Sequence, residues 1–139
     1  NISIGNDHAA TAYKFEIIKL LESKGIVVEN YGTDFHDSVD YPDFAHKLTK
    51  EVLSNQGSLG ILICGTGVGM SIAANRSRGI RAGLASNSHI ARLIRQHNDA
   101  NVLVIPGRFM DEKEAKNCVQ VFIDTDFESG RHKQRIEKI

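Results

Sequence analysis

Five short apolar runs, separated by segments with helical periodicity, restrict the fold of this chain more than any other feature. The runs are rich in β-branched residues and predict strands over residues 2–5, 26–29, 60–64, 79–85 and 101–105. The segments between and after them predict helices over residues 9–24, 43–53, 70–75, 88–97 and 111–123, and a basic helix from about residue 130. Parallel strands need crossover connections, so this alternation predicts a five-stranded parallel sheet flanked by helices.

The size of the chain indicates one hydrophobic core. Its 139 residues are close to the common size of a single domain, and no internal repeat or linker divides them. We therefore expect residues 1–139 to form one doubly wound, Rossmann-like α/β domain. Such sheets bind ligands beyond the carboxyl ends of their strands. In the first helix we expect a buried stripe made of Phe15, Ile17, Ile18, Leu20 and Leu21.

The region between the second strand and the second helix is polar and has no clear period. Residues 31–42 therefore predict a loop, and Asp43 is placed to cap the helix that follows.

Charge and cysteine content argue against several classes of protein. Lys plus Arg and Asp plus Glu both number 17, so the formal net charge is zero, whereas nucleic-acid binders normally carry a basic excess. Two cysteines cannot build the disulfide framework of a small secreted domain. No apolar stretch approaches the ~20 residues of a membrane span, and no signal peptide is visible. We expect a cytoplasmic protein without nucleic-acid or membrane partners.

The strongest candidate for chemistry is the glycine-rich segment Cys64-Gly65-Thr66-Gly67-Val68-Gly69, which follows the most apolar strand. Alternate glycines permit a tight turn, and the N-terminus of the next helix makes the loop a cradle for anions. The helix dipole is expected to lower the pKa of Cys64 and so favour its thiolate. A buried structural cysteine is an almost equally good interpretation. The third glycine comes one place earlier than in a dinucleotide-binding fingerprint. That fingerprint also needs an acidic residue about 20 positions later, and no acidic residue near position 89 ends a strand.

Three further clusters carry polar side chains that suit a sugar phosphate. Asp7-His8 can share in proton transfer, or can simply cap a helix. His97-Asn98 offers a general acid and a donor to an oxyanion, or merely ends a helix. Arg131 and Arg135 lie four apart, so on one helix face they suit a phosphate, although a solvated basic tail is an alternative.

Taken together, these groups fit proton abstraction beside a carbonyl, which is the chemistry of aldose–ketose isomerisation. The histidines and cysteines lack the spacing of a metal site, so we expect none.

The whole chain also resembles the type B ribose-5-phosphate isomerases, within the family that includes galactose-6-phosphate isomerase subunits. The matching motifs occur in the same order as in that family. They are Gly5-Asn6-Asp7-His8-Ala9, Asp40-Tyr41-Pro42-Asp43, the stretch from Gly60 to Asn75, Gly79-Ile80-Arg81-Ala82, the stretch from Arg95 to Leu103, and Phe127-Glu128-Ser129-Gly130-Arg131-His132.

The resemblance implies a role for each candidate position. Cys64 resembles the base that moves a proton between C2 and C1, and Thr66 a neighbour that handles the sugar oxygens. His97 resembles the acid that opens the furanose ring, with Asp7 as its partner. The residues that resemble binding groups are Gly65, Gly67 and Gly69 around the enediolate, Asn98 as a donor to it, Tyr41 against the ring, and His8, Arg108, Arg131 and Arg135 around the phosphate.

The resemblance further implies an enzyme without metal or cofactor, active as a homodimer or homotetramer. Its sites would be shared between subunits, so that the basic helix over residues 130–139 reaches a substrate. The implied reaction interconverts ribose 5-phosphate and ribulose 5-phosphate in the pentose phosphate pathway. Two alternatives stay open: a six-carbon substrate such as galactose 6-phosphate or allose 6-phosphate, and a non-catalytic module that binds sugar phosphates or nucleotides.

Overall fold

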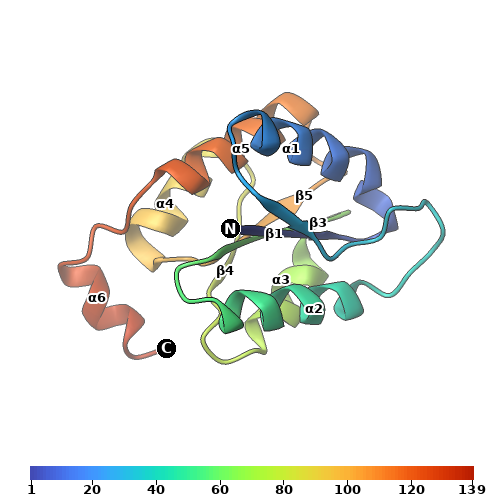
Figure 1. Ribbon diagram of the computed structural model, residues 1–139. Helices are drawn as coiled ribbons and strands as arrows, with labels where there is room; N and C mark the ends of the chain where they lie inside the picture. Colours follow the sequence, from blue (N-terminus) through green and yellow to red (C-terminus); the bar gives the residue numbers. More distant parts are fainter.

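A parallel sheet of five strands forms the centre of the computed structural model, which describes residues 1–139 (Figure 1). Its strands are β1 (Ile2–Asn6), β2 (Val28–Asn30), β3 (Leu59–Cys64), β4 (Ala82–Leu84) and β5 (Val102–Pro106), in the order β2-β1-β3-β5-β4. Every neighbouring pair is parallel, which confirms the predicted sheet. The strand order changes direction between β1 and β3, so ligands are expected near their carboxyl ends.

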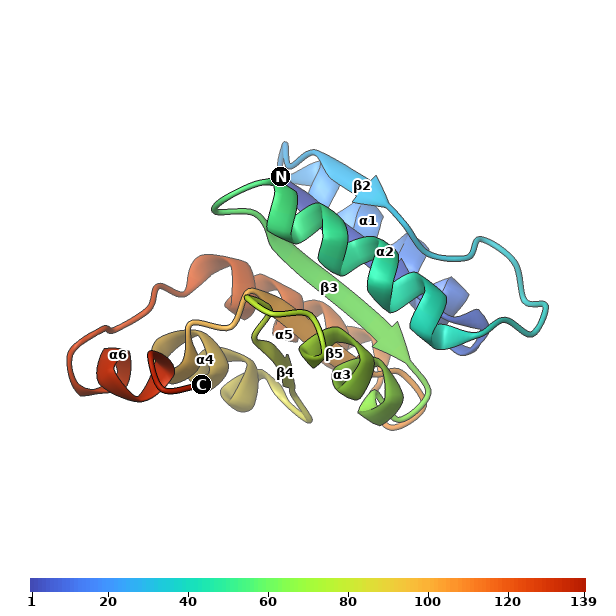
Figure 2. The same ribbon diagram turned by 90° about the horizontal axis from the view of Figure 1, so that it is seen from below.

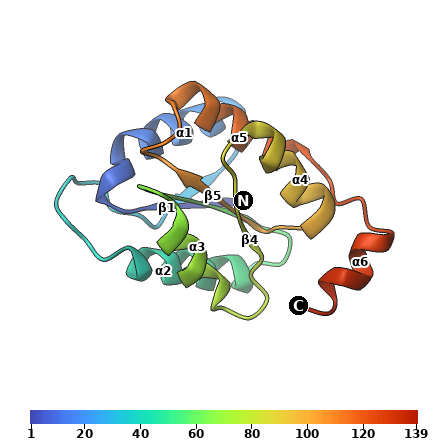
Figure 3. The ribbon, with the colours of Figure 1, turned by 180° about the vertical axis from the view of Figure 1, so that it is seen from behind.

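Helices cover both faces of the sheet (Figures 1 and 3). One layer contains α1 (Thr11–Ser23), α4 (Ser88–Asn98) and α5 (Glu112–Asp124), and the other contains α2 (Tyr41–Ser54) and α3 (Val68–Asn75). The terminal helix α6 (Arg131–Ile136) lies beside α4, away from the sheet. None of the helices is both long enough and apolar enough to cross a lipid bilayer.

Strand β3 shows why the middle of the sheet reads as an unbroken apolar run. Ile61 and Ile63 point into the core under α1, α4 and α5, whereas Leu62 and Cys64 point into the core under α2 and α3. All four side chains are buried. A strand covered on both faces has no polar side to reveal its period, so it is recognised by its length and its β-branched content.

Helix α1 departs from the predicted pattern in two ways. The segment begins as a 3₁₀ turn, η1 (His8–Ala10), before the α-helix starts at Thr11. Phe15 is 46% exposed, so its place in the buried stripe was wrong, and Ile18 and Leu20 are only half-buried. Lys14 is fully buried instead. The ammonium group of Lys14 donates to the carbonyl oxygen of Thr33 at 2.5 Å and pairs with Asp34, so the loop after β2 covers it.

Other element boundaries also differ from the prediction. Helix α2 begins at Tyr41 rather than at Asp43, with Pro42 in its first turn. Proline is well accommodated there because the first turn leaves backbone N–H groups without helical partners. Strand β2 starts at Val28 instead of residue 26, and β4 is only three residues long.

Candidate active site

The carboxyl ends of β1 and β3 bring the first group of candidate residues together. Cys64 is the last residue of β3, and Asp7 directly follows β1. The backbone N–H of Asp7 donates to the carbonyl oxygen of Ile63 at 3.2 Å, which keeps the two strand ends in register. The carboxylate of Asp7 accepts from the backbone N–H of Ala9 at 2.9 Å. Asp7 therefore does cap the first helical turn. Its negative charge also raises the pKa of the Cys64 thiol.

The glycine-rich loop wraps around the sulfur of Cys64. The backbone N–H of Gly67 donates to Cys64 Sγ at 3.2 Å. Gly67 has φ = 80°, and a Cβ there would lie 2.5 Å from Leu84 Cδ1, so both the turn and the packing require glycine. A Cβ at Gly69 would lie 2.5 Å from Cζ of Tyr41, so the Tyr41 ring packs against the start of α3. Within the loop, the backbone N–H of Gly67 thus faces the sulfur, and the Tyr41 ring lies against Gly69.

The protonation of Cys64 differs from the sequence-based expectation. Burial raises the pKa of its thiol, and the negative charge of Asp7 adds to this effect. Backbone N–H groups of Met70 and Gly67, and the charge of Arg108, only partly oppose it. The predicted lowering was therefore wrong, because removal from water outweighs the helix dipole at this depth. The resting group at neutral pH is the thiol.

We expect the alkylation rate of Cys64 by iodoacetamide to rise steadily from pH 7 to a pH above the ordinary pKa of a cysteine thiol. The reason is that only the thiolate reacts, and a raised pKa keeps its fraction small near neutrality. Mass spectrometry of the folded protein measures the rate at each pH. Cys118 serves as the internal control, because burial raises its pKa to about 12 and its side chain is fully covered. A rate that is already flat at pH 7 would contradict the raised pKa of Cys64.

His8 and Arg108 complete this group. Nδ1 of His8 accepts from the backbone N–H of Val39 at 3.2 Å, so a neutral ring carries its proton on Nε2 and can donate from there. The side chain of Arg108 lies over Gly65, where a Cβ would come within 3.2 Å of its Cδ. We call Asp7, His8, Tyr41, Arg108 and the segment Cys64–Gly69 the thiol half.

The loop that orients His8 depends on a residue that the prediction missed. Besides the contacts of Lys14, the hydroxyl of Thr11 donates to the carbonyl oxygen of Phe35 at 2.7 Å. These bonds tie the loop over residues 31–40 to α1 and so fix the backbone that reaches His8. The sequence did hold a signal, because Lys14 stands three and seven positions before Ile17 and Leu21, on the buried face.

The second group of candidates lies at the other end of the sheet. His97 and Asn98 end α4, and with Arg131 and Arg135 they line a cavity of about 290 Å³. We call these four residues the arginine half. His132, also in this cavity, stacks on His97 with ring centroids 4.4 Å apart. Burial and the neighbouring His97 lower the pKa of His132, which keeps its ring neutral.

One chain does not bring the two halves together. Cys64 pairs with Pro106 at the end of β5, whereas α4 ends just before Val102 at its start. The two ends of β5, Val102 and Pro106, are four residue steps apart, which corresponds to about 13 Å along the sheet. Figure 2 shows the arrowhead of β3 pointing away from α6. Helix α4 runs in the opposite direction to the strands, so its last residues lie at the end of the sheet where the strands begin. The sequence could therefore predict both groups of candidate residues without implying that they lie close together.

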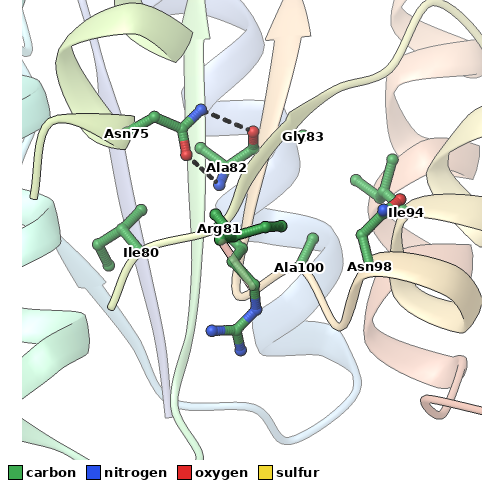
Figure 4. A pocket seen from close by; sticks show the side chains of 9 residues that line it. Asn75, Ile80, Arg81, Ala82, Gly83, Ile94, Asn98 and Ala100 are labelled. Carbon is green, nitrogen blue, oxygen red and sulfur yellow. Dashed lines mark hydrogen bonds between the residues drawn. The ribbon is translucent and has the colours of Figure 1, made fainter. Parts of the chain in front are cut away.

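A second cavity adjoins the arginine half at the edge strand β4 (Figure 4). It has a volume of about 340 Å³ and shares Asn98 and Ile139 with the first cavity. The side-chain amide of Asn75 donates to the carbonyl oxygen of Ala82 at 3.0 Å and accepts from its N–H at 2.8 Å. Asn75 therefore occupies hydrogen-bonding groups on the open edge of β4.

Comparison with known proteins places the whole chain among sugar-phosphate isomerases. The family described as Ribose/Galactose Isomerase matches residues 2–139. Ribose-5-phosphate isomerase B of Escherichia coli strain K12 is 43% identical over 138 residues, covering 99% of this chain and 93% of that protein.

Solved structures agree with this placement. A ribose 5-phosphate isomerase of Thermotoga maritima has a TM-score of 0.95 and 52% identity, over 99% of this chain and 94% of that one. Ribose-5-phosphate isomerase B of Mycoplasma genitalium, solved with bound ribulose-5-phosphate, has a TM-score of 0.96 and 42% identity, over 99% and 92% of the two chains. The chain belongs to the ribose/galactose isomerase family.

Proposed function

We propose that this chain interconverts ribose 5-phosphate and ribulose 5-phosphate through an enediolate. The observation that carries the proposal is the sulfur of Cys64, held at a strand end beneath a loop of backbone N–H groups and beside Asp7. The arrangement offers a base next to donors for a developing oxyanion, as proton transfer beside a carbonyl requires. The bound ribulose-5-phosphate in the M. genitalium relative supports this choice of substrate.

The reaction needs only proton transfers. With the sugar ring open, the small fraction of Cys64 that is ionised at neutral pH acts as the base: its thiolate takes the proton from C2, and the aldehyde oxygen at C1 gains negative charge. The thiol then returns the proton to C1, while the O2 hydroxyl proton moves to O1 and leaves a ketone at C2. Thr66, whose hydroxyl accepts from the backbone N–H of Val68 at 3.2 Å, would handle these oxygens from the same loop, and Gly67 and Gly69 would shape the backbone around them. We propose no metal or cofactor for these steps.

A complete site is proposed to form between two copies of the chain, as a homodimer or homotetramer. The thiol half would come from one copy, and the arginine half, with His97 as ring-opening acid, from its partner. Exposed apolar side chains on α3 support such a contact, since Val68 within the thiol half and Ile72 just beyond it are 50% and 59% exposed. His8, Arg131 and Arg135 would then hold the phosphate from both sides.

The direct test is formation of ribulose 5-phosphate from ribose 5-phosphate by the purified chain in excess chelator. Turnover would support the proposed substrate and reaction. Turnover of galactose 6-phosphate or allose 6-phosphate alone would favour a six-carbon substrate. Thermal stabilisation by nucleotides, without turnover of any sugar phosphate, would favour a binding module. The proposed place of action is the cytoplasm, within the pentose phosphate pathway.

Replacing Arg135 with Ala is expected to raise KM for ribose 5-phosphate by about tenfold or more and to change kcat much less. A paired hydrogen bond from guanidinium to phosphate is made equally in ground and transition states, so its loss weakens uniform binding. Steady-state kinetics in both directions measure the two constants. Lys138→Ala, which removes an exposed positive charge from the same end of the chain, is the control. A large fall in kcat at unchanged KM would contradict the phosphate role of Arg135.

A further inference from the structure

Glu128 brings two imidazole rings to one carboxylate oxygen near the arginine half. Nε2 of His97 and Nε2 of His132 each lie 3.8 Å from Oε1 of Glu128. The ligand atoms of these three residues all lie within 4.8 Å of one another. The proposed isomerisation uses His97 but gives neither Glu128 nor His132 a role.

The backbone holds this cluster in place. The N–H of Glu128 donates to the carbonyl oxygen of Gln96 at 3.1 Å, which fixes the chain before α6 against the end of α4. Ser129 and Gly130 then take φ values of 63° and 59° in the turn that starts α6, and His132, four residues after Glu128, lies with its ring beside that carboxylate. The two rings are stacked with an interplanar angle of 16°. Segments distant in sequence thus present three donors that are already close.

These three donors match the ligands and size of a transition-metal site. Zinc binds imidazole nitrogen and carboxylate oxygen at about 2.0–2.2 Å in tetrahedral geometry, which places neighbouring ligand atoms roughly 3.3 Å apart. The two separations between imidazole and carboxylate, 3.8 Å each, exceed this by about half an ångström, and all three ligand atoms lie within 4.8 Å of one another. A metal ion lies in the plane of each imidazole that binds it, so His97 must turn out of its stack on His132 before both rings can share one ion. The side chains of Glu128 and His97 are 52% and 38% exposed, which leaves room for both to rotate. A fourth position would stay open to water.

Charge around the cluster identifies Glu128 as the decisive ligand. Arg131 and Arg135 line the same cavity and oppose a cation, and His97 and His132 bring no negative charge. The carboxylate of Glu128 is the anionic group that faces both rings. Removing its charge should therefore weaken metal binding more than removing any other carboxylate of the terminal segment.

We propose that His97, Glu128 and His132 bind a divalent transition-metal ion of the zinc type, and that the bound ion inhibits turnover. The ion would occupy the Nε2 lone pair of His97, and this nitrogen could then no longer give a proton to the sugar ring oxygen. The inhibitory effect rests on the proposed isomerase function, whereas the binding itself does not. The proposal assigns the ion no part in the reaction.

Binding is tested with Co²⁺ as a spectroscopic probe added to the metal-free protein. We expect one Co²⁺ per chain, a visible absorption band of four-coordinate nitrogen and oxygen ligation, and displacement by Zn²⁺. Glu128→Gln should weaken Co²⁺ binding by at least about tenfold, because even groups outside the ligand set contribute 10–100-fold. Glu137→Gln, which removes an exposed carboxylate just after α6, should bind Co²⁺ like the parent.

A competing location for the metal is the thiol of Cys64. Cys64→Ala should therefore keep the Co²⁺ spectrum and affinity. Binding lost in Cys64→Ala but kept in Glu128→Gln would overturn the proposed site, as would the absence of binding in the parent protein.

Inhibition is tested separately, with ribose 5-phosphate as substrate. Zn²⁺ should inhibit the parent at the concentration that fills the site, chelator should restore turnover, and Glu128→Gln should need at least about tenfold more Zn²⁺. Full occupancy without inhibition would overturn the regulatory part of the proposal. If Co²⁺ binds as described while no sugar phosphate is turned over, the proposed isomerase function fails and the metal site stands.

Discussion

Replacing Cys64 with Ala is expected to lower kcat by about 10²–10⁴-fold, the usual contribution of a positioned acid–base group. The sulfur lies inside the glycine loop, where it receives the backbone N–H of Gly67 at 3.2 Å, and as a thiolate it offers the basic atom of the proposed step. Alanine keeps the strand end and the glycine loop but has nothing to accept the C2 proton. Steady-state rates in both directions measure the loss.

Cys118→Ala is the matched control for this substitution. Cys118 is also a buried thiol, but it lies in α5, and its sulfur contacts the sulfur of Met110 at 3.8 Å rather than the loop. We expect this variant to lose some thermal stability and to keep its turnover. Circular dichroism should show the parent fold for both variants. If Cys64→Ala kept most of its activity while folded, the base would have to be another group.

Exchange of the C2 hydrogen with solvent gives an independent measure of the same step. In deuterated water the parent should incorporate deuterium into the sugar, since the thiol proton exchanges while it resides on sulfur. Cys64→Ala should incorporate deuterium slower by the same factor as its turnover. Exchange at the parental rate in a variant without turnover would locate the defect after proton abstraction.

The parallel sheet was predictable because its signals are local. A run such as Gly60 to Cys64 is apolar and β-branched, and glycines after it mark a tight turn, so neither inference needs knowledge of distant contacts. Apart from Tyr41, which starts α2, the residues of the thiol half stand at or just after the ends of strands. Their proximity is a consequence of parallel topology alone.

Other features could not be predicted because they depend on contacts between distant segments. Lys14 is buried only because the loop that carries Thr33 and Asp34 covers it. The pKa of Cys64 depends on depth below the surface, which a dipole argument does not contain. The cluster around Glu128 arises from a turn that packs against α4, and no spacing in the sequence resembles a metal motif there.

Two inactive variants are expected to restore activity to each other if they form one oligomer. Cys64→Ala damages the thiol half and His97→Asn the arginine half, and within one chain these halves lie at opposite ends of the sheet. In a mixed dimer one site then receives both damaged halves, and the other receives both intact ones. Mixed dimers isolated with two affinity tags should thus show about half the parental turnover, since a two-fold interface forms two equivalent sites.

The control pairs two variants of the same half. A mixed dimer of Cys64→Ala and Asp7→Asn has a damaged thiol half in each site, so its activity should stay near that of the separate variants. Restoration in the first mixture and not in the second would establish that the two halves come from different chains. No restoration in either mixture, with mixed oligomers present, would require His97 to act within its own chain. The separation of β3 and β5 ends from the end of α4 argues against that outcome, because no side chain spans about 13 Å of sheet.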